Sequence, residues 1–128
     1  MSVHIVRLGS PRSPGEGLRF GTVRRPPRGV PKSQFAQRDF YDVWLPELAP
    51  AAATIKLALH SDNVADWRRF VRCYQREMAA PTCAHLLDLL AALSRHTSFA
   101  VGCYCADEAR CHRSLLRVLL ADRGASLA

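Results

Sequence analysis

Residues 98–120, SFAVGCYCADEARCHRSLLRVLL, decide the fold because three patterns follow one another in them. Ser98 to Tyr104 is a short apolar run typical of a buried strand. Ala106 to Arg110 is polar and predicts a loop. From Cys111 or His112 onward, leucines recur at helical spacing. The stretch therefore predicts a strand, a tight loop and a helix start, with Arg113 in the first turn of the helix.

The remaining chain adds further strands and helices. Strands are expected at residues 3–8 and 18–25. Helices are expected after residue 50 and after Ser61–Asp62, whose oxygens can cap a helix. A further helix, expected to be well buried, runs from residue 81 to about residue 95. Strands separated by helices predict one domain, residues 1–128, of the α/β class. We expect a small, mainly parallel sheet with helices packed on it in Rossmann-like layers. Residues 3–8 and 98–104 are expected to be neighbouring parallel strands.

Composition narrows the setting of the protein. The chain is 48% hydrophobic and 23% charged, which is ordinary for a globular domain. It has no apolar run of about 18 residues that could span a bilayer, and its first residues do not resemble a signal peptide. Five cysteines make an odd and poor disulfide framework. These features predict a cytoplasmic protein that does not act in a membrane.

Positive charge is concentrated in the first third of the chain. The net charge is +7, and residues 1–40 hold eight basic side chains against only Glu16 and Asp39. Such an excess favours an anionic partner, either a small molecule or nucleotide, or a nucleic acid. Residues 26–32 include three prolines and cannot form a regular element. They predict a loop that presents Arg25, Arg28 and Lys32 as anion-binding residues.

The loop after the 98–104 strand carries the chemistry. Free amides and the dipole at a helix start attract anions, and Arg110 and Arg113 would add positive charge there. The same environment acidifies a thiol, so Cys111 and Cys105 are candidate nucleophiles. His112 is the candidate general acid–base. We therefore expect a phosphate-bearing or other anionic small molecule to bind at residues 103–113.

Three other interpretations of this segment remain open. Three thiols and an imidazole suggest a metal, but Cys103-x-Cys105 on a strand points its thiols to opposite faces, so we expect no structural zinc and no cofactor. Cys105 and Arg110 have the C-x4-R spacing of rhodanese-type sulfurtransferases, whose loops normally contain glycine. Alternatively, the cysteines are core packing, and the arginines pair with Asp107 and Glu108.

Two motifs resemble a known family. Residues 25–32, RPPRGVPK, and 41–50, YDVWLPELAP, resemble the YeaO-like family, the domain of unknown function 488. Its members carry R-x-W-P-R-G-x-x-K followed by W-x-x-x-L-A-P-S, and a helix similar to residues 67–78 follows. Here Pro26 replaces the family tryptophan and Ala51 replaces the serine. Residues 111–113 resemble a C-H-R motif found in one branch. The resemblance implies a small α/β fold in a bacterial cytosol, without an activity.

The parallel sheet leads to one geometric expectation. If the 18–25 and 98–104 strands run parallel, the loops that follow them leave from the same edge of the sheet. The basic groups of the two loops, represented by Arg28 and Arg113, would then lie near one ligand. Nucleic-acid binding by the basic first third is the alternative use of these charges.

Overall fold

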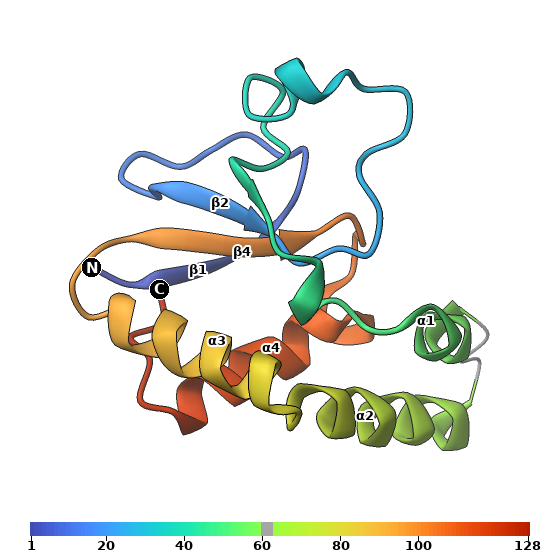
Figure 1. The fold of residues 1–128 in the computed structure, drawn as a ribbon. Helices are drawn as coiled ribbons and strands as arrows, with labels where there is room; N and C mark the ends of the chain where they lie inside the picture. Colours follow the sequence, from blue (N-terminus) through green and yellow to red (C-terminus); the bar gives the residue numbers. More distant parts are fainter. Residues whose placement is uncertain (60–62) are drawn as a thin grey trace.

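A four-stranded, all-parallel sheet forms the centre of the computed structural model, which describes residues 1–59 and 63–128. The strand order is β1-β4-β2-β3, and helices lie along one face of the sheet (Figure 1). The strands are β1 (Val3–Arg7), β2 (Leu18–Gly21), β3 (Val43–Trp44) and β4 (Phe99–Cys103). The helices are α1 (Ala52–Leu59), α2 (Val64–Met78), α3 (Pro81–Leu93) and α4 (His112–Asp122), with short 3-10 turns at Lys32–Gln34, Pro46–Leu48 and Glu108–Arg110.

β4 is the central strand, and its sequence explains why. All five of its residues, FAVGC, are buried, as a parallel strand covered on both faces requires. Val101 is in register with Ile5 of β1 and with Phe20 of β2. Gly102 has no room for a side chain, because a Cβ there would lie 2.5 Å from the carbonyl oxygen of Val6. The predicted α/β class, and the parallel pairing of the first strand with β4, are therefore confirmed.

The main core lies between the sheet and the helices. Leu87 and Leu90 of α3 and Leu116 and Leu120 of α4 pack in one buried cluster with Val101 of β4. Figure 1 shows α3 and α4 running beneath the sheet, with α1 and α2 extending past the end at which the strands finish. That end is the carboxyl edge, where ligands bind in open α/β sheets. None of the helices in the described ranges is long and apolar enough to cross a membrane.

Three sequence expectations need correction. β2 ends at Gly21 rather than near Arg25: the Thr22 amide still donates to the Gly102 carbonyl of β4, and the basic loop follows it. β3 was not predicted, since two residues of edge strand give no periodicity. α3 is only partly buried: Leu89 and Leu93 are exposed. The helix cap expected at Ser61–Asp62 falls outside the described residues.

Asn63 caps α2 directly. Its side-chain oxygen accepts a hydrogen bond from the Asp66 amide at 2.8 Å, which satisfies one of the free amides of the first turn. The arginines of α2 predicted to lie off its apolar stripe are exposed, as expected for a solvated face: Arg68, Arg69, Arg72 and Arg76.

Candidate functional site

The segment after β4 has the predicted strand, loop and helix start. β4 ends at Cys103, the 3-10 turn occupies Glu108–Arg110, and α4 begins at His112, so Arg113 is in the first turn of the helix. The loop is held by its own groups, because the Asp107 carboxylate accepts a hydrogen bond from the Ala109 amide at 3.0 Å. This arrangement returns the chain to the end of β4 and places residue 111 beside residue 103.

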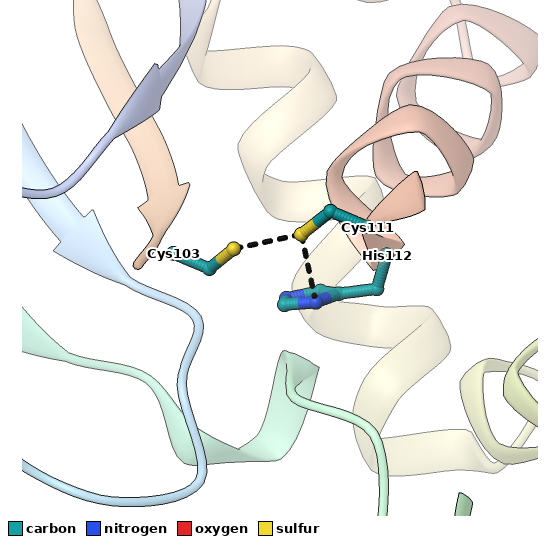
Figure 2. Close-up of side chains that lie close together, drawn as sticks. All are labelled: Cys103, Cys111 and His112. Atoms are coloured by element: carbon teal, nitrogen blue, oxygen red, sulfur yellow. Dashed lines mark hydrogen bonds between the residues drawn. The ribbon is translucent and has the colours of Figure 1, made fainter. Parts of the chain in front are cut away.

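Two thiols and an imidazole meet at this point (Figure 2). The Sγ atoms of Cys103 and Cys111 are 2.7 Å apart, and the Sγ of Cys111 is 3.6 Å from Nδ1 of His112. Cys103 belongs to the central strand, whereas Cys111 and His112 stand at the start of α4. All three residues are buried, with His112 exposed by 7%. We refer to these three residues as the Cys–His cluster.

The histidine ring is held in one tautomer. Nε2 of His112 is 2.7 Å from the carbonyl oxygen of Thr22, and a carbonyl can only accept a hydrogen bond, so Nε2 carries a proton. The Thr22 hydroxyl donates to the Gly102 carbonyl and lies 3.2 Å from the same nitrogen. The ring of Tyr74 packs against the imidazole, with centroids 5.5 Å apart. Nδ1 is therefore directed at the Cys111 sulfur, where it can exchange a proton with the thiol.

The surroundings of Cys103 and Cys111 shift the pKa values of the two thiols in opposite directions. A hydrogen bond from Cys103 lowers the pKa of Cys111, and His112 lowers it further, although Cys105 and burial act to raise it. Cys111 is also the N-cap residue of α4, where the helix dipole favours a thiolate. The pKa of Cys103 is raised by its hydrogen bonds to Cys105 and Cys111 and by burial. Of the two thiols in the cluster, Cys111 is therefore the more readily ionised and Cys103 the less.

Cys105 is the exposed member of the three thiols in this segment. Hydrogen bonds from Cys103 and Cys111 lower its pKa, and the positive charges of Arg113 and Arg7 act in the same direction. Its backbone amide is 3.4 Å from the Cys103 sulfur. It thus stands at the mouth of the Cys–His cluster rather than within it.

A cavity of about 460 Å³ opens above the Cys–His cluster. Its wall is largely apolar and comes from α1, α2 and the segments that follow β2 and β4. Its described lining residues include four arginine or lysine side chains and no aspartate or glutamate. The lining includes Arg24, Arg25, Lys56, Phe70, Cys111 and Arg110.

Two of the four cations are held in place. Arg24 donates to the backbone carbonyls of Pro50 and Ala49 at 3.1 and 2.9 Å. The guanidinium of Arg110 lies over the ring of Trp67, 5.6 Å from its centroid. These contacts hold both guanidinium groups, and their positive charge, beside the cavity.

The predicted anion-binding residues are divided among several places. Arg25 and Arg110 line the cavity together. Arg113 is buried and donates from Nη2 to the Cys105 carbonyl at 2.6 Å, which holds the start of the β4–α4 loop against α4. Lys32 lines a different cavity, of about 480 Å³, beside Trp44. Arg28 is exposed and lies in the lining of neither cavity.

Other basic residues of the first third have structural partners. Arg19 is fully buried and paired with Glu16, and Arg12 lies within 3.3 Å of Asp39 and 2.9 Å of Asp42. One alternative interpretation paired Arg110 and Arg113 with Asp107 and Glu108, but Glu108 binds Arg117 of α4 at 2.8 Å. The excess charge of residues 1–40 is thus partly neutralised inside the fold.

Several residues of the site were not predicted from the sequence. Thr22 orients the histidine, Tyr74 packs on it, and Lys56 contributes a cation from α1. Tyr74 carried a weak signal, since it lies on the apolar stripe of α2 and ends in a polar hydroxyl. Thr22 carried none, because its role depends on a backbone carbonyl that packing places beside His112.

The Cys–His cluster also has the composition of a metal site. Its three ligand atoms lie within 4.8 Å of one another. Two thiolates on one tetrahedral zinc stand about 3.8 Å apart, given Zn–S bonds of about 2.3 Å. The sulfurs at 2.7 Å would have to separate by about 1 Å to share an ion. Zinc was not expected because Cys103 and Cys105 point to opposite faces of a strand, but the fold pairs Cys103 with Cys111.

These features define a small α/β protein with a cysteine–histidine cluster under a cation-lined cavity at the carboxyl edge of its sheet. The chain matches the family model described as the active DUF488-N3 subclade over residues 3–124, and it therefore belongs to the DUF488 family. No curated protein and no solved structure gives a significant match.

Proposed function

We propose that the protein binds a small anionic molecule in the cavity and acts on it with Cys111 and His112. The observation that carries this proposal is the position of the cysteine–histidine pair beneath a lining whose described residues include four arginine or lysine side chains and no carboxylate. Arg24, Arg25, Lys56 and Arg110 favour a phosphate, sulfonate or carboxylate group on the ligand. Phe70 and the other apolar wall residues favour an uncharged portion beside it.

The thiol supports a nucleophilic role. Cys111 combines a lowered pKa, a helix N-cap position and a histidine nitrogen at 3.6 Å, which together favour a thiolate–imidazolium pair. His112 would return the proton to the group that leaves. The description of the matched family as an active subclade agrees with a catalytic role.

Rhodanese-type sulfur transfer at Cys105 is less well supported. A thiolate cradle needs free backbone amides, but the Ala109 amide is bound to the Asp107 carboxylate. The amides of Arg110 and Cys111 are bound to the carbonyls of Asp107 and Glu108. Nucleic-acid binding is also less favoured, because Arg12 and Arg19 of the basic first third are already paired.

The binding proposal is tested with two ligands that share a ring and differ in charge. We expect phenyl phosphate to bind and benzylammonium not to bind, as measured by calorimetric titration. Arg110→Glu should weaken phenyl phosphate binding by at least about tenfold, since it replaces an attraction with a repulsion worth roughly 1–3 kcal/mol. Arg72→Glu, the same charge reversal on the exposed face of α2, should bind like the unaltered protein. Equal binding of both ligands, or equal losses in both variants, would refute the proposal.

Salt dependence separates a cavity ligand from a nucleic acid. Contacts with a phosphate backbone lose about 10³ or more in affinity between roughly 50 and 200 mM salt when six or more phosphates are neutralised. A single anion in the cavity releases few counterions, so phenyl phosphate should lose less than about tenfold over this range. Tighter, steeply salt-dependent binding of DNA or RNA by the intact chain would favour the nucleic-acid alternative.

A further inference from the structure

We propose that Cys103 and Cys111 form a redox-active pair, which a small hydroperoxide oxidises to a disulfide. The pair is a modification site within the Cys–His cluster, and its oxidation does not depend on whether the cavity binds an anion. Three features of the structure carry this inference: the approach of the two sulfurs, the unequal acidity of the two thiols, and the burial that restricts the oxidant.

The two sulfurs are positioned for a bond. At 2.7 Å they are about 0.7 Å from the length of a disulfide, roughly 2.05 Å, and further from the separation that a shared zinc requires. The backbone on each side is fixed. Cys103 ends a strand paired on both sides, and its carbonyl accepts from the Leu8 amide, while the Cys111 amide donates to the Glu108 carbonyl. Little movement is needed to bring the sulfurs together.

The two thiols have the complementary states that the reaction requires. The Cys111 thiolate attacks one oxygen of the hydroperoxide, the O–O bond breaks, and Cys111 becomes a sulfenic acid. The departing oxygen takes a proton from the His112 imidazolium and leaves as water or an alcohol. The Cys103 thiol then attacks the Cys111 sulfur, the S–O bond breaks, and the hydroxide leaves with the Cys103 proton as water. Two thiols are oxidised by two electrons, and one peroxide is reduced.

The burial of the Cys103 and Cys111 sulfurs limits the size of the oxidant that can reach them. Both sulfurs line the cavity, but each cysteine is only 2% exposed, so a hydroperoxide as small as hydrogen peroxide can reach them more easily than a bulky disulfide. The resulting disulfide would remove the thiolate that faces His112. Oxidation would therefore stop nucleophilic chemistry at Cys111 until a dithiol reductant restores the two thiols.

The test maps the cysteines after one equivalent of hydrogen peroxide has been added to the reduced, full-length protein. Trypsin cuts after Arg110 and separates peptide 96–110 from peptide 111–113, so a disulfide between Cys103 and Cys111 appears as a cross-linked pair. We expect this pair, with a chain mass lower by two hydrogens, and its loss when dithiothreitol is added. Recovery of both peptides fully alkylated, or one tightly bound zinc ion per chain with no reaction, would overturn the proposal.

Variants identify the partner of Cys111. In Cys103→Ser, oxidation should stop at a sulfenic acid on Cys111 that dimedone traps, and disulfide formation should slow by more than tenfold. Cys73→Ser, on α2 and away from the cluster, should behave like the unaltered protein. In Cys105→Ser the cross-link should persist, and its disappearance would assign the partnership to Cys105 and refute the pair. If Cys103→Ser fails to fold, fragmentation of the cross-linked peptide from the unaltered protein makes the same assignment.

Discussion

Replacing Arg19 with methionine is expected to destabilise the fold by about 3–5 kcal/mol, because it leaves a buried carboxylate without its partner. Arg19 and Glu16 are buried together, with Nε and Oε2 2.6 Å apart. The same guanidinium donates to the carbonyls of Ser10 and Asp39 at 2.7 and 2.6 Å. It therefore ties the β1–β2 loop and the β2–β3 connection together beside the amino end of β2. Chemical denaturation measures the loss.

A matched surface pair provides the control. Arg123 is 3.0 Å from Asp88, whose side chain is 65% exposed, so Arg123→Met should cost less than about 1 kcal/mol. A difference of less than about 1 kcal/mol between the two variants would contradict the structural role given to Arg19.

The same ion pair gives a pH dependence. Burial acts to raise the pKa of Glu16, but hydrogen bonds from Arg19 and Ser13 outweigh it, and the pKa is lowered. A lowered carboxyl pKa stabilises the fold fully above the ordinary value of about 4.3. The stabilisation is lost as pH falls from there through the lower pKa of the folded state. Arg19→Met should therefore lose much of this part of the acid dependence.

Substituting His112 with glutamine is expected to slow alkylation of Cys111 at pH 6 by about 10- to 100-fold. Glutamine can still donate to the Thr22 carbonyl but offers no basic nitrogen to the sulfur. The pKa of Cys111 would then move toward the ordinary thiol value of about 8.5, at which little thiolate is present at pH 6. The unaltered protein should keep a high rate as pH falls below about 8.5, because its thiol pKa is lowered.

An exposed histidine makes the comparison specific. His85→Gln on α3 changes the same atoms away from the cavity and should leave the alkylation rate of peptide 111–113 unchanged. Identical pH profiles in the His112 and His85 variants would show that His112 does not lower the pKa of Cys111.

Much of the fold could be predicted because local patterns and packing agree. The β4–loop–α4 unit was predictable from an apolar run followed by leucines at helical spacing, and both patterns are satisfied by burial. β3 was not, because it consists of two exposed edge residues placed by contacts with β2. The role of Arg19 was equally hidden, since a single arginine on a strand gives no sign that distant carbonyls surround it.

The kind of chemistry at the candidate site could be predicted from the sequence, but not which residues lie together there. Cys111, His112 and Arg110 were identified because they follow a strand and begin a helix. The pairing of Cys103 with Cys111 depends on how the loop folds back, which residue spacing does not specify. Arg28 was predicted to contact the ligand, but it lies in the lining of neither cavity. Composition does not tell which basic residues of a loop face a cavity.

Protection of the thiols by an anion tests the central claim most directly, since it requires the cations and the Cys–His cluster to share one cavity. The measurement compares alkylation rates of Cys105 and Cys111 with and without saturating phenyl phosphate, using benzylammonium, which has a similar ring and the opposite charge, as the control. We predict that phenyl phosphate slows both rates by at least about tenfold, because its phosphate lies among the cations and its ring covers the sulfurs. Benzylammonium should leave the rates unchanged. Unchanged rates with phenyl phosphate, or equal protection by benzylammonium, would contradict the account.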